Sequence, residues 1–307
     1  MPRLSRPAPP RLSPEAEGFL ADLEDRGRAA NTLAAYRRDL AAYEAFLADR
    51  RLTVAGAGED DVTAYLTAME AAGRRPASMA RALVALRSLH RWCGSDAARS
   101  VDGPSQVSSE PALLTEAEAA ALVESVGGPG GGATARRDRA LLELLYATGA
   151  RISEAVGLDV RDVEGGLVHL GGRNPRAVPY GAPAGAALAA WLRPTGRVAM
   201  GGRPAATGDA GGALFLNQQG GRLSRQWGWS VVRAAGDRAG LAGRMGPHVL
   251  RHSFAVHLAV RGAPPAAVQQ LLFGQPAPFT LDELVAVYRR RHPRGICEPA
   301  PDAPLSQ

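Results

Sequence analysis

The sequence predicts a mainly α-helical protein with two domains and a small β component in the second domain. Apolar residues recur every three or four positions over most of the chain, which is typical of amphipathic helices. Alternating, strand-like segments cluster around residues 167–180. The length of 307 residues suits two hydrophobic cores better than one.

The first domain is predicted at residues 13–94, after a Pro- and Arg-rich, disordered lead over residues 1–12. Ser13 is the expected N-cap of the first helix, which Gly27 ends, and Asn31 is the expected N-cap of the second. Four helices are predicted, over residues 13–27, 31–51, 59–73 and 75–94.

A polar segment rich in Gly, Ser and Pro, residues 95–112, is predicted to be a linker. The second domain follows at residues 113–295, and residues 296–307 form a tail. The first helix of the second domain begins with a capping box of Thr115 and Glu118. The later elements are expected as helices over 136–149 (ended by Gly149) and 150–158, strands over 167–170 and 177–180, a short strand over 213–217, and helices beyond.

The charge distribution points to a polyanionic partner. The formal net charge is +6, and all 36 basic residues are arginine, so no lysine is available as a proton donor. Between Arg222 and Arg294 there are eleven arginines and three acidic residues. A concentrated basic surface of this kind is typical of nucleic-acid binding.

The two cysteines indicate neither a disulfide framework nor a zinc site, because they lie far apart and without metal-binding spacing. The sequence shows no signal-peptide pattern and no uninterrupted apolar stretch long enough to cross a membrane. We therefore expect a soluble, cytoplasmic protein with no membrane partner and no metal.

Three cationic residues are candidates for a shared site. Arg151 begins a helix, and His248 and Arg251, spaced i and i+3, share a helix face. There are alternative interpretations. Arg151 could form a structural salt bridge, and His248 and Arg251 could be a polar pair whose hydrogen bonds are made within the protein. Two arginines and a histidine are also suitable donors for a metal-free phosphoryl-transfer site, which needs several cations converging on one phosphate.

The segments that contain these residues resemble the tyrosine recombinase (phage-integrase-type) family, and within it the Xer-like site-specific recombinases. The resemblance rests on "NTLAAYRRDLAAYEAFL", "RRDRALLELLYATGARISEAVGLDVRDV", "HVLRHSFAVHLAVRGA" and "LVAVYRRRHPR", in the order of the family. It implies a helical SAM-like core-binding domain and a mixed α/β catalytic domain that together bind duplex DNA as an oligomer. It also implies that a tyrosine attacks the scissile phosphate without a metal or cofactor, and that the protein has no small-molecule substrate.

The resemblance assigns roles to the three candidates. Arg151 matches the first phosphate-binding arginine and Arg251 the second, while His248 matches the acid/base histidine of an H-x-x-R pair. Their task would be to neutralise the charge that develops on the phosphate oxygens in the transition state.

Two other positions depart from the family pattern. The hairpin segment "GGRNPRAVP" has no general-acid lysine, and Arg173 is the nearest possible substitute. The pKa of an arginine is too high for efficient proton donation to a leaving oxygen. Gln275 stands where the family has histidine or tryptophan, and a glutamine can donate a hydrogen bond but cannot shuttle a proton.

The nucleophile is the largest departure. Roughly eight residues, which carry the tyrosine nucleophile in the family, are missing between Gln275 and Phe279, judged by the spacing of the flanking motifs. Tyr288 then matches a structural tyrosine of the family. A buried helix stripe of Leu281, Leu284, Val285 and Tyr288, at i, i+3, i+4 and i+7, is predicted and favours packing. The alternative is that Tyr288 is itself the nucleophile.

Eight further arginines are candidate DNA contacts, with helix-end solvation as the alternative for the last three: Arg37, Arg81, Arg87, Arg222, Arg225, Arg289, Arg290 and Arg291.

The favoured hypothesis is a nucleoid-associated, DNA-binding recombinase-like protein impaired in strand cleavage. An active enzyme with a rearranged site using Tyr288 and Arg173 is the second hypothesis. A non-catalytic regulator or interaction module is the third.

Overall fold

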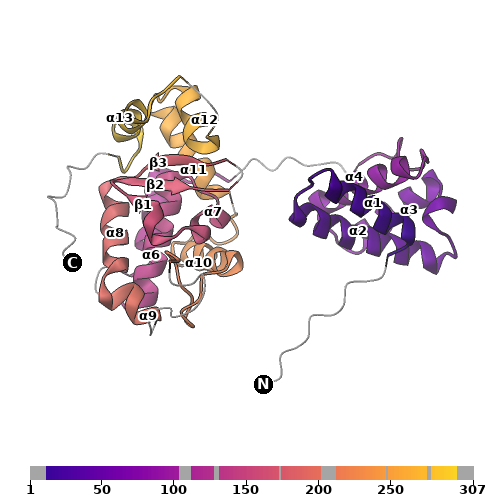
Figure 1. Ribbon diagram of the computed structural model, residues 1–307, viewed down its shortest axis with the longest axis horizontal. Helices are drawn as coiled ribbons and strands as arrows, with labels where there is room; N and C mark the ends of the chain where they lie inside the picture. The colour runs from indigo at the N-terminus through magenta and orange to yellow at the C-terminus, as the bar shows by residue number, and fades with distance from the viewer. Residues whose placement is uncertain are drawn as a thin grey trace. The chain divides into compact units, whose positions relative to one another are not determined.

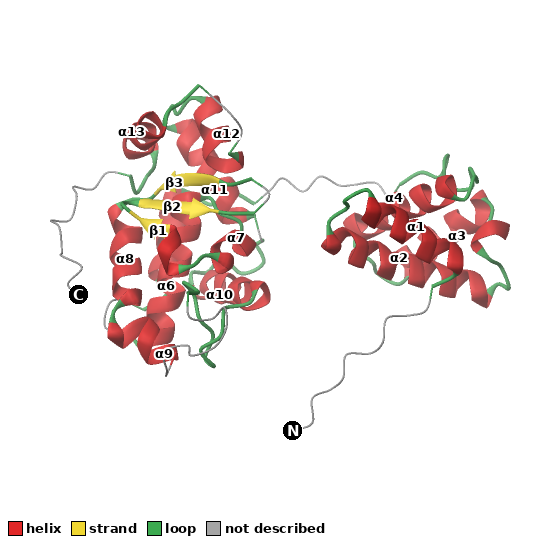
Figure 2. Cartoon of the chain, viewed as in Figure 1, coloured by secondary structure: helices red, strands yellow, loops and turns green. Residues whose placement is uncertain are grey.

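The computed structural model describes residues 12–103, 112–127, 131–172, 174–201, 212–246, 248–274 and 278–295. The chain divides into two compact units, Met1–Ser108 and Ser109–Gln307, both drawn in Figure 1. Helices predominate in both units, and the strands of the described residues lie in the second, as Figure 2 shows. The predicted fold class is confirmed.

The first unit is a helical bundle. Ser13 caps the first helix as predicted, since its Oγ accepts a hydrogen bond from the Ala16 amide at 3.2 Å. The predicted cap at Asn31 is wrong: the helix already begins at Ala30, so Asn31 lies within its first turn, and Ala29 is the extended N-cap residue. The helices are α1 (Pro14–Asp25), α2 (Ala30–Asp49), the short 3₁₀ helix η1 (Val54–Gly56), α3 (Glu59–Ala71) and α4 (Pro76–Trp92).

The core of the first unit extends beyond the four helices. Leu40, Tyr43 and Leu86 are fully buried at its centre. Ala98 and Val101 are also buried in this core, although they fall within the predicted linker. Burial of these two apolar residues and hydrogen bonds from Arg87 to their carbonyls together hold the chain just after α4.

The second unit packs helices around a three-stranded antiparallel sheet of order β1-β2-β3. Val168 pairs with Val178, and Leu170 pairs with Arg176. The strands are β1 (Val163–Glu164), β2 (Leu167–Leu170) and β3 (Arg176–Pro179). The helices are α5 (Glu116–Glu124), α6 (Ala133–Thr148), α7 (Ile152–Gly157), η2 (Val160–Asp162), α8 (Ala182–Leu192), η3 (Pro194–Val198), α9 (Ala199–Gly201), α10 (Arg225–Arg238), α11 (Val249–Val260), α12 (Pro265–Phe273) and α13 (Leu281–Arg291).

Side-chain caps explain the starts of three helices in this unit, α5, α10 and α13. The Thr115 Oγ1 accepts from the Glu118 amide at 3.1 Å while the Glu118 carboxylate accepts from the Thr115 amide at 2.8 Å, which confirms the capping box. Residues 213–217 make only isolated bridges, Asp159 with Ala213 and Leu216 with Arg222, so the predicted strand there is wrong. Among the described residues these bridges do not extend into a ladder.

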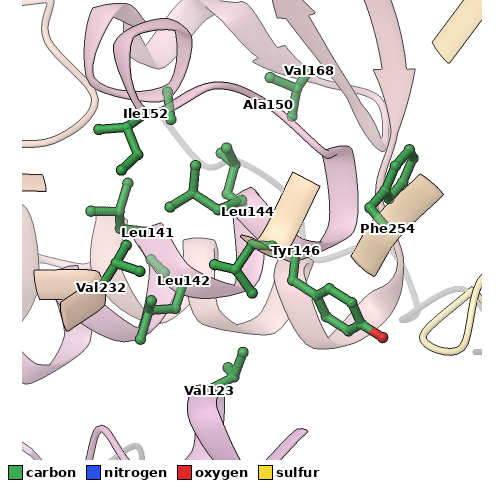
Figure 3. Close-up of a cluster of buried hydrophobic side chains, with 14 of the residues drawn as sticks. Val123, Leu141, Leu142, Leu144, Tyr146, Ala150, Ile152, Val168, Val232 and Phe254 are labelled. Atoms are coloured by element: carbon green, nitrogen blue, oxygen red, sulfur yellow. The ribbon is translucent and has the colours of Figure 1, made fainter. Parts of the chain in front are cut away.

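Helix α6 runs through the centre of the core. Figure 3 shows Leu141 and Leu142 of α6 clustered with Val123 of α5 and Val232 of α10. All four side chains are 2% exposed or less, and burial of each contributes roughly 1.5–3 kcal/mol. Helix α6 is therefore firmly packed, and Arg151 follows shortly after its C-terminal end.

None of the helices in the described ranges has the length and hydropathy needed to span a membrane.

Candidate functional site

Arg151 lies in the tight connection between α6 and α7. Gly149 ends α6 in the left-handed conformation, at φ 60°, and a Cβ there would lie 2.6 Å from the Phe254 ring, so a glycine is required. Arg151 is the N-cap of α7, and Glu154 accepts hydrogen bonds from both the Arg151 amide (2.7 Å) and its guanidinium (2.9 Å). The Arg151 side chain remains 38% exposed.

Glu154 is the centre of an arginine cluster. Both terminal nitrogens of Arg176 bond its carboxylate at 3.0 Å, and Arg251 lies 3.9 Å from it. Burial alone would raise the pKa of Glu154, but hydrogen bonds from Arg176 and from the Arg151 amide outweigh burial and lower it. One carboxylate thus faces three guanidinium groups, which leaves a local excess of two positive charges.

Arg251 is held in place by backbone carbonyls. Its Nη1 donates to the carbonyl of Gly149 at 2.7 Å and its Nη2 to that of Leu272 at 2.8 Å. Burial, assisted by the nearby charges of Arg151 and Arg176, lowers the pKa of Arg251 to about 10. The group is still charged at neutral pH, and an anion that reaches it would meet a poorly solvated cation.

His248 lies at the N-cap position of α11, one turn before Arg251, and its side chain is exposed. The structure therefore gathers Arg151, Arg251 and the unpredicted Arg176 on a single carboxylate. It places His248 on the same helical turn as Arg251.

A cleft of about 610 Å³ opens beside Arg151. One wall is formed by α7, including Ser153 and Glu154, and the other by the β2–β3 turn, including Gly172 and Asn174. Arg173 belongs to this turn but lies outside the described residues, as does Gln275. Their predicted roles remain predictions.

Tyr288 lies away from solvent. It is 1% exposed, its ring stacks on His292 with centroids 4.6 Å apart, and its hydroxyl has no hydrogen-bond partner among the described residues. Burial raises the pKa of this hydroxyl far above its usual value. A buried, protonated hydroxyl is the placement expected of a packing residue, and it argues against the rearranged-site alternative.

The predicted stripe on α13 is only partly correct. Leu284 is buried together with Tyr288, and Val285 is half-buried. Leu281 is 41% exposed, so its predicted burial is wrong. Leu281 is the first residue of the helix, and no element among the described residues covers it fully, although the apolar periodicity of the sequence includes it.

Three predicted DNA contacts in the first unit have partners within the chain. Arg37 forms a bidentate pair with Glu17, and Arg81 forms one with Asp39 at 2.8 and 3.0 Å. Arg87 donates to two backbone carbonyls after α4. These bonds give each arginine a structural role, and DNA contact by them stays a prediction.

The predicted contacts in the second unit differ in their surroundings. Arg222 bonds the carbonyls that end α7 and the Asp159 carboxylate, so it supports α7, the helix whose N-cap is Arg151. Arg291 donates to the carbonyl of Arg261 at 2.7 Å. The other three are exposed at a helix start or end: Arg225, Arg289 and Arg290.

Glu154 and Arg176 are functional-site residues that the sequence patterns did not predict. The i, i+3 spacing from Arg151 to Glu154 is a usable signal, since opposite charges at this spacing lie close enough to form an ion pair. Arg176 carried no such signal, because only strand pairing and the approach of α12 reveal that it is buried, with its Nε bonded to the Leu271 carbonyl at 2.8 Å. Within the described ranges, no group of three or more His, Cys, Asp or Glu side chains is placed to hold a metal ion.

Two family models match the chain. The model described as the phage integrase family matches residues 112–273, and the model of the phage integrase N-terminal SAM-like domain matches residues 16–95. Together they cover parts of both structural units.

Curated relatives match over most of their length. Tyrosine recombinase XerD of Mycobacterium tuberculosis (strain ATCC 25618 / H37Rv) is 44% identical over 284 residues, which cover 85% of this chain and 89% of the relative. Tyrosine recombinase XerC of Mycobacterium bovis (strain BCG / Pasteur 1173P2) is 36% identical over 287 residues, with 87% and 94% covered.

Solved structures share the fold at lower identity. The XerH site-specific recombinase bound to its difH substrate matches with a TM-score of 0.62 at 20% identity, covering 93% of this chain and 88% of that one. The lambda integrase tetramer bound to a Holliday junction matches with a TM-score of 0.65 at 16% identity, covering 94% and 79%. With both domain models matched and close relatives named tyrosine recombinases, the chain belongs to the phage integrase family.

Proposed function

We propose that this protein binds duplex DNA as a site-specific recombinase-like protein and that its strand-cleavage step is impaired. The arginine cluster is the main support for DNA binding, because Arg151, Arg176 and Arg251 share the single carboxylate of Glu154. A backbone phosphate reaching Arg151 and Arg251 would neutralise charge that the protein leaves uncompensated.

The roles of the individual residues follow from their exposure. Arg151, which is 38% exposed beside the cleft, makes the outer contact, and the deeper Arg251 adds a cation in a poorly solvated setting. His248, exposed one turn before Arg251, donates to a phosphate oxygen. The lambda integrase tetramer bound to a Holliday junction supports DNA as the partner and the assembly of several copies on it, and a protein bound to chromosomal DNA would lie in the nucleoid.

The impairment is inferred from the groups that strand cleavage needs. A cleaving recombinase requires a reachable nucleophile and an acid for the leaving oxygen. Tyr288 is buried, and the chain has no lysine. Gln275 and Arg173 replace the proton-transferring groups implied by the family resemblance, and neither side chain donates a proton readily at neutral pH.

The cleavage test uses nicked suicide duplexes, in which a cut strand diffuses away and traps the covalent adduct. Duplexes enriched from a randomised pool by binding to this protein supply the substrates, and the XerD relative serves as the positive control. We expect bound complexes but no covalent adduct. An adduct that Tyr288→Phe abolishes would establish the rearranged site instead, and an adduct that survives this substitution would reveal another nucleophile.

The binding test measures affinity for one duplex over a range of salt concentrations. Phosphate-dominated binding weakens steeply with salt. Arg151→Gln should weaken binding and reduce the salt slope by about one, whereas the matched variant Arg161→Gln, at an exposed arginine of the same unit, should change little. Salt-insensitive binding, or none, would favour the interaction-module hypothesis.

A further inference from the structure

A small pocket opens between α6 and α8, which lie side by side in the second unit (Figure 1). Its volume is about 190 Å³, below the range of about 300–1,000 Å³ that is typical of pockets for whole small-molecule ligands. The lining residues are Pro183, Ala186, Ala187 and Ala190 of α8, Arg136, Arg139 and Glu143 of α6, and Gly127. A pocket of this size suits one or two side chains of a peptide segment.

The wall that α8 contributes is apolar. Its four residues are spaced i, i+3, i+4 and i+7, so they share one face of the helix. Ala186 is exposed, and the other three are half-buried. Small side chains in these positions leave the α8 backbone close to anything that enters the pocket.

The wall that α6 contributes is charged. Arg139 is 26% exposed and Arg136 is half-buried, whereas Glu143 is only 1% exposed. The Oε1 atom of Glu143 already accepts from Arg294 and, at 3.4 Å, from Arg139. The negative charge is therefore buried and paired while the positive charges reach the surface, so the pocket complements an acidic partner.

The described part of the chain reaches Gly295 at the edge of this pocket. A Cβ added to Gly181, the N-cap of α8, would lie 1.8 Å from the Arg294 carbonyl oxygen and 3.6 Å from the Gly295 Cα. The backbone at residues 294–295 therefore lies against the start of α8, next to Pro183. The bond from the Arg294 side chain to Glu143 places the same residue beside the α6 wall.

The sequence that follows matches the pocket in charge and polarity. Residues 296–307, ICEPAPDAPLSQ, lie outside the described residues; they contain the acids Glu298 and Asp302 and no basic residue. Most of the others are apolar, beginning with Ile296 and Cys297.

The distances along the two walls suit this segment. An extended chain advances about 3.3 Å per residue, so Glu298 lies within about 10 Å of Gly295. Arg139 and Arg136 precede Glu143 on α6 by about 6 Å and about 10 Å, from a helix rise of about 1.5 Å per residue. The carboxylate of Glu298 can thus reach the two arginines while the residues before it pass the alanines of α8.

We propose that residues 296–307 bind in the α6–α8 pocket of the same chain, with Ile296 and Cys297 against the alanines of α8 and Glu298 paired with Arg139 and Arg136. An attached segment is favoured over a free peptide because its effective concentration is of millimolar order. The interaction goes beyond the proposed function, because no pocket residue belongs to the Glu154 arginine cluster. It anchors the chain that follows α13.

Disulfide trapping in the full-length protein tests this contact through the native Cys297. In a Cys93→Ser background Cys297 is the only cysteine. Ala187→Cys then places a second thiol in the pocket, and the control Ala189→Cys places one on an exposed part of α8 that does not line it. A disulfide requires Cα atoms about 4.4–6.8 Å apart, so it reports close approach.

We expect the Ala187→Cys variant to form an intramolecular disulfide about tenfold faster than the Ala189→Cys variant under mild oxidation. Rates are corrected for the reactivity of each thiol toward a small disulfide reagent, and circular dichroism verifies folding. Mass spectrometry identifies the linked peptides. Non-reducing gels at several protein concentrations separate links within one molecule from links between two.

The charged contact is tested by changes in the segment itself, which leave the folded units intact. Glu298→Gln should slow trapping by about threefold, the value of an exposed ion pair, and high salt should have a similar effect. The matched change Asp302→Asn should leave the rate close to that of the parent protein.

Three outcomes would overturn the proposal. Equal rates for Ala187→Cys and Ala189→Cys would show that the segment does not enter the pocket. A disulfide mainly between two molecules would assign the pocket to a second copy, and equal effects of Glu298→Gln and Asp302→Asn would exclude the specific pairing. The measurement uses no DNA, so a loss of DNA binding in Arg151→Gln, or its absence, bears only on the proposed function.

Discussion

Replacing Glu154 by Gln tests the arginine cluster most directly. The substitution keeps the size of the side chain but removes the negative charge that faces Arg151, Arg176 and Arg251. Two of these three arginines are nearly buried, with side chains 3% and 11% exposed. Without Glu154 their charges would repel one another with little water to screen them.

The expected magnitude follows from this burial. Removing one partner of a buried ion pair costs about 3–5 kcal/mol in the free energy of unfolding. For a unit of this size the loss corresponds to a fall in Tm of about 10 °C. The control Glu116→Gln removes a carboxylate from an exposed pair with Arg261, whose side chains are 40% and 35% exposed, and should cost no more than about 1 kcal/mol.

Anions should also affect the stability of Glu154→Gln. A site that has lost its carboxylate has a larger positive excess, so phosphate or duplex DNA should stabilise Glu154→Gln more than wild type. Differential scanning fluorimetry with and without inorganic phosphate measures both effects. A variant as stable as wild type, or one that phosphate fails to rescue, would refute the view that Glu154 compensates a cationic phosphate-binding cluster.

The remaining predictions concern single positions. Tyr288→Phe should leave the free energy of unfolding unchanged or slightly higher, because the lost hydroxyl has no partner among the described residues, whereas Tyr288→Ala should cost about 3–5 kcal/mol in chemical denaturation. Gly149→Ala should destabilise by about 2 kcal/mol or more and weaken DNA binding, since its φ of 60° and the nearby Phe254 ring oppose a Cβ; wild-type stability would contradict this. Because the folded pKa of Glu154 lies below its ordinary value, its contribution is present above about pH 4.3 and is lost as the pH falls through the lowered pKa. The stability difference between wild type and Glu154→Gln should therefore shrink on acidification below about pH 4, and a constant difference would count against the ion-pair account.

Local signals in the sequence determined most of the helices and their ends. The cap at Ser13, the capping box of Thr115 and Glu118, and the stop at Gly149 each depend on residues within one turn of each other, so they can be read without knowing the fold. Asn31 shows the limit of this approach, because a good capping residue in the first turn of a helix looks the same in the sequence as one at the N-cap position. The ordered motifs around Arg151 and Arg251 also sufficed to indicate the family.

Only the tertiary structure decided what surrounds the candidate site. Arg151 and Arg251 are a hundred residues apart, and they meet because α6, α7, α11 and α12 pack against one core. The role of Arg176 and the burial of the Tyr288 hydroxyl depend on long-range packing in the same way. Burial and charge compensation are properties of neighbours in space, and periodicity along one helix does not report them, as the exposed Leu281 illustrates.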